Sequence, residues 1–163
     1  MITMSQDELF SFFQEHLICE SLTKEEVGRL THFLRDKQYG SNEIISDIGE
    51  VGDCLSFVIE GKVQFLHPED KDVTSVGKQG EGSLIGEMSF FDRKPRNLRM
   101  AASSKGATVL ELTRAMYDRL KVEEPFIAVN ILENAIVSLD DLVRHMGDDI
   151  SAMEHYMHGF GKR

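Results

Sequence analysis

The spacing of hydrophobic residues changes twice along the chain. In residues 1–37 they recur at helical spacing, and Thr23-Lys24-Glu25-Glu26 has the capping-box pattern of a helix start. Over residues 38–112, short runs of β-branched and aromatic residues alternate with glycines, which is typical of antiparallel strands and turns. Helical spacing returns over residues 113–163, where Pro125 suits the first turn of a long helix. The sequence therefore predicts an α+β fold, in which an antiparallel β roll (jelly roll) is flanked by N-terminal helices and a long C-terminal helix.

The β section is predicted to contain short strands separated by turns and interrupted by one short helix over residues 87–91. The expected turns cover residues 59–62 and 68–71, where glycine or proline breaks a hydrophobic run. The expected strands are residues 43–46, 54–59, 62–66, 72–76, 96–103 and 107–112. Ser5 and Thr113 are further candidates for helix starts.

The C-terminal helix carries a regular heptad pattern. Its hydrophobic residues lie alternately three and four positions apart, and β-branched residues at the a positions favour a parallel two-stranded coiled coil. We therefore expect a homodimer through residues 129–157, and the acidic flanking positions predict that its association strengthens with salt or at low pH. An amphipathic helix packed on its own roll is the alternative interpretation. The a positions are Val129, Ile136, Val143, Ile150 and Met157, the d positions are Leu132, Leu139, Met146 and Met153, and the acidic flanking residues are Glu133, Asp140, Asp149 and Glu154.

Positive charge is concentrated in one segment of an acidic chain. Four basic residues lie within seven positions, although the net charge of the chain is -10. A guanidinium in this segment can bind two phosphate oxygens, and the carboxylate of Glu87 can accept a hydrogen bond from a ribose hydroxyl. The segment therefore predicts a site that binds the sugar and the phosphate of one nucleotide. The basic residues are Arg93, Lys94, Arg96 and Arg99.

The same segment resembles the binding cassette of the cyclic-nucleotide-binding domain family, of the catabolite-activator and cAMP-dependent-kinase type. The likeness rests on Gly82-Ser-Leu-Ile-Gly-Glu-Met-Ser-Phe followed by Pro95-Arg96, and it extends over residues 38–145. It implies that cAMP or cGMP binds in the roll, with the phosphate on Arg96 and the start of the short helix and the ribose hydroxyl on Glu87. The implied ligand-binding residues are Gly86, Glu87, Met88, Ser89, Pro95, Arg96, Asn97 and Leu98.

Two features bear on the shape and selectivity of the implied pocket. The family usually has a small residue where this chain has Leu98, and strand alternation would direct Leu98 and Met100 toward the same side as Arg96, which narrows the pocket. Family members that prefer cGMP often carry Thr where this chain has Asn97, which favours cAMP slightly. Alignment on the proline of the long helix places Leu142 and Val143 at the family's purine contacts, with Arg144 or Ser138 as polar substitutes.

Composition and motifs disfavour several other classes of function. The acidic balance, with a pI of about 5.0, disfavours nucleic acid as a partner, and few residues follow Met157, so we expect no helix-turn-helix. Within the β section His67 is the only histidine, which disfavours a metal enzyme on this roll, and we interpret His155 and His158 as solvated. We find no plausible set of nucleophile, base and orienting group, and so predict a protein without enzymatic activity, cofactor or metal.

The remaining expectations concern the compartment and the cysteines. The chain shows neither a positively charged leader nor an apolar run long enough to cross a membrane, so we expect a cytoplasmic protein without a membrane contact. Cys19 and Cys54 lack metal-like spacing, and we expect both to be reduced, buried thiols.

Two functional hypotheses follow from these patterns. The first is a free-standing sensor in which a bound cyclic nucleotide changes the geometry of the dimer and so signals to a separate downstream protein. The second is an interaction module that keeps the fold and the dimer but binds no nucleotide. The two differ in whether Arg96 binds a phosphate.

Overall fold

The computed structural model of the protein describes residues 2–69 and 72–160, with side chains described over residues 2–67 and 76–148. The chain begins with helices α1 (Gln6–Glu15) and α2 (Lys24–Leu30), followed by the short 3-10 turn η1 (Thr31–Phe33). Both helices start with a capping box, which the sequence predicts at Thr23, whereas at Ser5 it predicts only a helix start: the hydroxyls of Ser5 and Thr23 accept hydrogen bonds from the backbone N–H groups of Glu8 and Glu26. The N-terminal helices and their starts are therefore confirmed.

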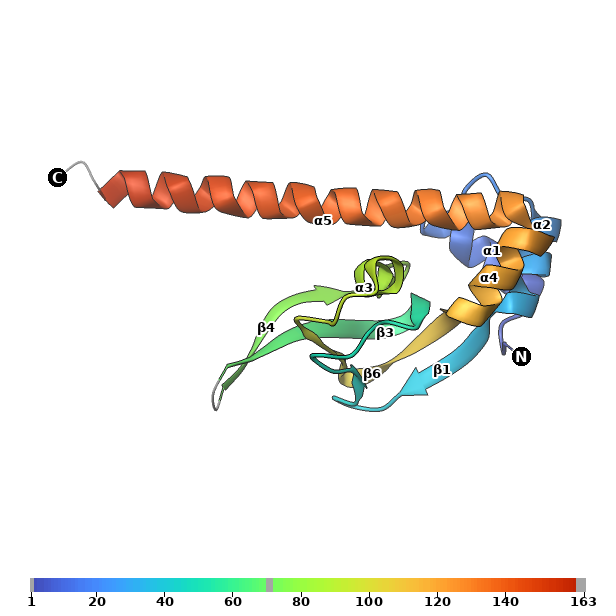
Figure 1. The fold of residues 1–163 in the computed structure, drawn as a ribbon, viewed down its shortest axis with the longest axis horizontal. Helices are drawn as coiled ribbons and strands as arrows, with labels where there is room; N and C mark the ends of the chain where they lie inside the picture. The colour runs from blue at the N-terminus through green and yellow to red at the C-terminus, as the bar shows by residue number, and fades with distance from the viewer. Residues whose placement is uncertain (1, 70–71, 161–163) are drawn as a thin grey trace.

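Six strands form one antiparallel sheet that folds into a roll (Figure 1). The strands are β1 (Arg35–Tyr39), β2 (Ile44–Ser46), β3 (Cys54–Glu69), β4 (Asp72–Gln79), β5 (Leu84–Ile85) and β6 (Arg99–Thr113). The two long strands organise the roll, since β3 pairs with β4, β5 and β6, and β6 pairs with β1, β2 and β3. The first strand already begins at Arg35, within the range 1–37 that the sequence analysis assigns to the N-terminal helices.

The predicted turn at residues 59–62 is wrong, because β3 continues through it. The pairing of β3 with β6 shifts register on both sides of this point, between Val58 and Glu60 and between Gly61 and Val63. Gly61 has a φ of +77°, and a Cβ atom there would lie 2.3 Å from the carbonyl oxygen of Gly106. This glycine serves a β-bulge with a close backbone approach, so the strand bends without reversing.

The predicted break in the last strand is also wrong. Residues 96–103 and 107–112 were expected as two strands, but a single strand, β6, runs from Arg99 to Thr113. Gly106, which has a φ of +79°, lies inside it opposite the bulge of β3. Both strands therefore bend at the same level of the roll, which lets one pair of strands form both halves of it.

Three further helices complete the fold: α3 (Glu87–Asp92), α4 (Arg114–Glu123) and α5 (Pro125–Phe160). Thr113 caps α4, since its hydroxyl accepts a hydrogen bond of 3.3 Å from the N–H of Met116, and Pro125 opens α5 as predicted. In Figure 1, α5 runs along one side of the roll with α3 between them, while α1, α2 and α4 gather around its N-terminal end. The antiparallel roll with a long C-terminal helix is confirmed.

The hydrophobic core has two parts. One lies between the helices and the roll and contains Phe13, Leu30, Phe57 and Ile131, whereas the other fills the roll around Val58, Val63, Met100 and Val109. Because β3 contributes side chains to both parts, it connects them.

The two cysteines differ in their surroundings. Cys19 is buried as expected, and burial raises the pKa of its thiol to about 12, so it stays protonated. Cys54 is only half-buried, which corrects the expectation for this residue: it starts β3 at the rim of the roll, within 4.0 Å of an Arg35 nitrogen. The predictions for the outer heptad positions, their acidic flanking residues and the two C-terminal histidines concern side chains outside those that the structure describes. These residues are Asp149, Ile150, Met153, Glu154, His155, Met157 and His158.

The bulge at Gly61 predicts a large loss of stability on substitution. Gly61→Ala should lower the free energy of unfolding by about 2 to 4 kcal/mol, because the new methyl group meets the backbone in a left-handed conformation. Gly49→Ala is the matched control, since Gly49 also has a positive φ of 86° but nothing lies within 4 Å of its Cβ position. We expect Gly49→Ala to lower the free energy of unfolding by about 1 to 2 kcal/mol. Urea denaturation measures both, and equal losses would contradict a steric role for the bulge.

Candidate functional site

The candidate site forms where β5 ends and α3 begins. Gly86 links the two with a φ of 86°, and a Cβ atom there would lie 2.9 Å from the carbonyl oxygen of Cys54 and 3.4 Å from Nη2 of Arg96. Glycine is required because both the backbone of β3 and a guanidinium approach closely. It also leaves the start of α3 without a side-chain cap.

Glu87 is a buried carboxylate at the start of α3. It is 8% exposed, and its Oε1 accepts a hydrogen bond of 2.9 Å from the hydroxyl of Ser138 on α5. Burial raises the pKa of Glu87, while the bonds from its own backbone N–H and from Ser138 and the charge of Arg96 act in the opposite direction. The carboxylate is thus held in one orientation by two different elements.

Arg96 is a half-buried guanidinium with few polar partners. Among the residues whose side chains are described, its buried Nε atom has no hydrogen-bond partner, and Nη1 lies 3.9 Å from the thioether sulfur of Met100. Burial lowers the pKa of Arg96, and the charges of Glu50 and Glu87 counter that effect without either carboxylate forming an ion pair with it among the described residues. A guanidinium that is partly buried and forms no ion pair with a neighbouring carboxylate can bind an additional anion.

The backbone around Arg96 fixes where its side chain starts. The N–H of Arg96 donates to the carbonyl of Glu50 over 2.8 Å, and its carbonyl accepts from the N–H of Gly49 over 2.9 Å. A Cβ atom on Gly52 would lie 2.7 Å from Nη2 of Arg96. The guanidinium therefore fits against two glycines, at positions 52 and 86, from neighbouring loops.

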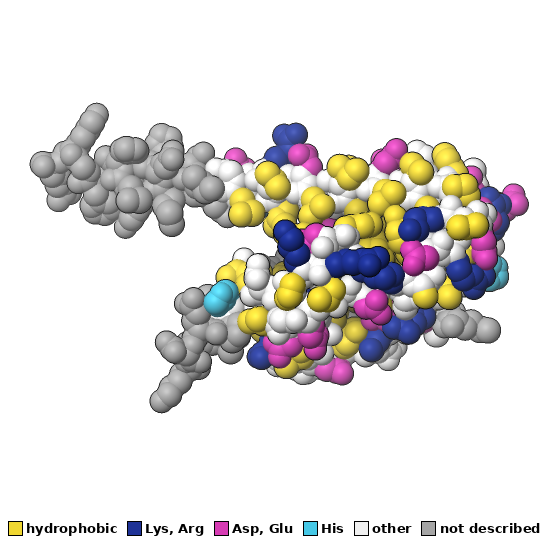
Figure 2. Space-filling view, viewed as in Figure 1, with side chains coloured by type: hydrophobic (Ala, Val, Ile, Leu, Met, Phe, Trp, Pro, Cys, Tyr) yellow, Lys and Arg dark blue, Asp and Glu magenta, His cyan; other side chains and the backbone are white. Residues whose placement is uncertain are grey.

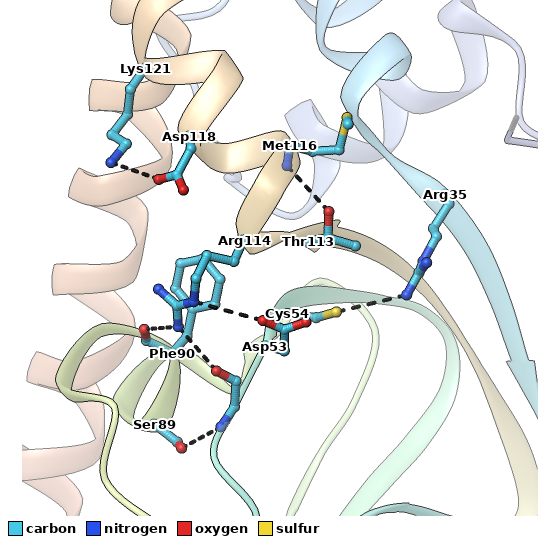
Figure 3. Close-up of polar contacts among 11 residues, drawn as sticks. Arg35, Asp53, Cys54, Ser89, Phe90, Thr113, Arg114, Met116, Asp118 and Lys121 are labelled. Carbon is cyan, nitrogen blue, oxygen red and sulfur yellow. Dashed lines mark hydrogen bonds and ion pairs between the residues drawn. The ribbon is translucent and has the colours of Figure 1, made fainter.

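A network of hydrogen bonds ties α3 to its surroundings (Figure 3). Ser89 accepts from the N–H of Gly52 over 2.6 Å and donates to the carbonyl of Lys94 over 2.7 Å. Arg114 donates to the carbonyls of Phe90 and Gly52 over 2.5 and 3.1 Å, with its guanidinium 4.3 Å from the centre of the Phe90 ring. Ser89 and Arg114 thus hold the loop before β3, α3 and the start of α4 in one arrangement.

The other residues of the predicted cassette lie around Glu87 and Arg96 with different exposures. Met88 and Asn97 are exposed, and Pro95 forms a bridge with Val51. Met100 contacts Arg96, as strand alternation predicts, but residues 97–98 form a bend before β6 begins. The prediction that Leu98 lies toward the site rested on strand alternation, which does not hold through a bend, so it stays a prediction; Leu98 is half-buried.

The predicted base contacts on α5 are exposed, and Figure 2 shows hydrophobic side chains at the surface along this helix. Leu142 and Val143 are 41% and 65% exposed, and Arg144 pairs with Asp140 of the same helix over 2.8 Å. Their role as a lid stays a prediction. Ser138 was considered only as a contact for the base, and its bond to Glu87 was not anticipated. Nor were Gly52 and Arg114, since nothing in the local sequence connects them to α3.

Two absences concern the described residues alone. No helix among them combines the length and the hydropathy that a membrane span requires. Nor do three or more histidine, cysteine or acidic side chains come together there as a metal site would need.

Comparison with known proteins decides the family. The model of the cyclic nucleotide-binding domain matches residues 36–122, which include all of β1 except Arg35, the strands β2 to β6, Glu87 and Arg96. The chain belongs to the cyclic nucleotide-binding domain family.

Two bacterial channels contain a region similar to this chain. A cyclic nucleotide-gated potassium channel of Mesorhizobium japonicum is 30% identical over 95 residues, which are 58% of this chain and 25% of the channel. The chain thus spans about a quarter of the curated channel relatives that it matches, at 25% and 27% of their lengths.

Solved structures of low sequence identity share the fold of this cyclic nucleotide-binding domain. A cyclic nucleotide-binding domain from Methylobacillus flagellatus has a TM-score of 0.78 at 23% identity, covering 91% of this chain and 83% of that one. The catabolite activator protein of Thermus thermophilus has a TM-score of 0.68 at 23% identity, covering 88% of this chain and 62% of that one.

The buried carboxylate gives this cyclic nucleotide-binding domain a pH-dependent stability. The pKa of Glu87 is raised in the folded state, so the folded protein holds the proton more tightly than the unfolded chain does, and stability falls as pH rises above the ordinary value of 4.5. Glu87→Gln should remove this part of the slope and raise the free energy of unfolding at pH 7. Urea denaturation at several pH values from 4.5 to 7 measures how the free energy of unfolding depends on pH. Glu20→Gln is the control, because Glu20 is exposed. Parallel slopes for Glu87→Gln and the wild type would contradict it.

Proposed function

We propose that this domain binds a cyclic mononucleotide, cAMP or cGMP, with the phosphate on Arg96 and the ribose hydroxyl on Glu87. One observation carries the proposal: a half-buried guanidinium without a carboxylate partner among the described residues lies beside a buried carboxylate. Membership of the family and the names of the channel relatives support the class of ligand.

The phosphate is assigned to Arg96 on electrostatic grounds. Removing a guanidinium from water is unfavourable unless an anion accepts its hydrogen bonds, and the thioether of Met100 is a weak acceptor. A phosphate offers two oxygens to the planar fork, including one within reach of the unpartnered side. Since α3 has only 6 residues, we assign the main contribution to Arg96 and not to the helix start.

The ribose is assigned to Glu87 because an ionised carboxylate only accepts hydrogen bonds. It attracts a hydroxyl and repels a phosphate, while Arg96 does the reverse. Two opposite charges at the two ends of the site therefore orient one nucleotide. We propose binding and regulation for this site, and no catalysis.

A path from the site to α5 runs through aromatic rings. Phe90 is fully buried on α3, and its ring packs edge-on against Tyr117 of α4, with centroids 5.5 Å apart. Phe91 approaches the same tyrosine, at 6.0 Å. A shift of α3 on binding would move α4, which joins α5 directly, so we propose that ligand binding is transmitted along this route.

We further propose that the output is a change in a homodimer formed through α5. Supporting this, Ile127, Ala128, Ile131 and Ala135 face the core, while the a positions lie on the other side of the helix. Val129, Ile136 and Val143 are 47%, 64% and 65% exposed. A second α5 would cover this stripe and leave the roll accessible. The downstream protein that reads the dimer is a separate partner of unidentified chemistry.

Titration calorimetry with cAMP and with cGMP tests the ligand. Arg96→Ala should weaken binding by about 2 to 4 kcal/mol, or about 30- to 1,000-fold, because the phosphate loses its charged partner in a partly buried site. Lys94→Ala is the control: it removes the same charge two positions away, where the side chain is exposed, and should cost far less.

An absence of heat with either nucleotide at millimolar concentration would contradict the proposed ligand. With Arg96→Ala indistinguishable from the wild type, that result would favour the interaction module. Equal losses in Arg96→Ala and Lys94→Ala would instead point to a general electrostatic attraction without a defined phosphate site.

Sedimentation equilibrium tests the dimer. Ile136→Asp should weaken association at least about 10-fold, because it buries a charge in the proposed seam. Val137→Asp is the matched control, since Val137 is equally apolar and 59% exposed but lies outside the a and d positions. Added salt should strengthen the dimer, because it screens the like charges of Glu133 and Asp140 beside the seam. A monomeric wild type, or equal effects of the two substitutions, would contradict the seam.

A further inference from the structure

The hydrogen bond between Ser138 and Glu87 joins the nucleotide site to the long helix directly. The hydroxyl of Ser138 donates to Oε1 of Glu87 over 2.9 Å, across two elements that are far apart in the sequence. The carboxylate is buried and already receives its own backbone N–H. A carboxylate has about four acceptor positions, and burial limits the access of a further hydroxyl to those that these two donors leave open.

Ser138 also lies where α5 leaves the body of the protein. Before it, Ile131 and Ala135 are buried in the core, and after it residues 140–148 are exposed. The side-chain bonds found beyond Ser138 in the described part of α5 stay within the helix, from Arg144 to Asp140 and between His145 and the carbonyl of Asp141. Within the described part of α5, Ser138 thus makes the last side-chain hydrogen bond to another element, the helix α3.

The two roles of Glu87 compete. A ribose hydroxyl needs an acceptor oxygen on the same carboxylate to which Ser138 donates, and both donors are neutral hydroxyls of similar strength. When the ribose hydroxyl takes the position of the Ser138 hydroxyl on Oε1, Ser138 turns away, and the outer part of α5 loses its hydrogen bond to α3. The exchange couples occupancy of the site to the restraint on the helix.

We propose that Ser138 is a positioning residue that holds α5 against α3 in the ligand-free protein, and that a ribose hydroxyl releases it by taking its place on Glu87. The release of Ser138 by a ribose hydroxyl rests on the proposed function. The restraint of α5 by Ser138 concerns the ligand-free protein alone, so the two claims can be tested separately.

The ligand-free test compares Ser138→Ala with the wild type by amide hydrogen exchange and by NMR titration of the Glu87 carboxyl. We expect faster exchange over residues 139–148 and a higher pKa of Glu87, because the bond from Ser138 favours its charged form. Ser138→Thr keeps the hydroxyl and should restore both. Val137→Ala, on the exposed side of the same turn, should change neither. Unchanged exchange and pKa in Ser138→Ala would overturn the proposed restraint.

The ligand test repeats the calorimetry with cAMP and cGMP. Ser138→Ala should bind the preferred nucleotide about 3- to 10-fold more tightly, because one competing hydrogen bond to a charged acceptor is gone. Equal or weaker binding would overturn the competition and would instead make Ser138 a support for the Glu87 orientation that the ligand needs. Absence of heat in the wild type as well as in the variant would overturn the proposed function and the competition together, while the exchange data would still decide the restraint.

Discussion

The site depends on one constraint: the charge of Arg96 has to be kept partly out of water. Its guanidinium packs against Gly52 and Gly86, and its backbone is held between Gly49 and Glu50. A side chain at Gly52 would displace the guanidinium, one at Gly86 would press against the carbonyl of Cys54, and any shift of the loop before β3 would move the attachment of Arg96. The loop, the turn into α3 and the first residues of β6 are therefore arranged around this single cation.

The protein holds α3 firmly on one side and loosely on the other. Toward α4 and the loop before β3, it is fixed by Ser89, Arg114 and the buried ring of Phe90, which together satisfy several backbone groups. Toward the outer part of α5, the polar contact found among the described residues is the hydroxyl of Ser138. This asymmetry gives the helix a fixed frame and one side that can respond to a ligand.

Local chemistry made much of this fold predictable. The capping boxes at Ser5 and Thr23, the cap at Thr113 and Pro125 each act within one turn of a helix, so a few neighbouring residues determine them. Gly61 misled the prediction because a glycine with positive φ serves a turn and a bulge equally well, and only the partner strand decides between them. Arg96 and Glu87 were predictable because their motif is contiguous, whereas the Ser138 contact arises from the packing of α5, about which nearby sequence carries no information.

The continuity of α5 has a geometric consequence. From Ser138 to its end at Phe160 the helix runs without a break. At about 1.5 Å per residue, this segment forms a rigid arm of roughly 33 Å. A tilt of about 10° at its base would sweep the tip through roughly 6 Å, which is more than the rise of one helical turn, about 5.4 Å.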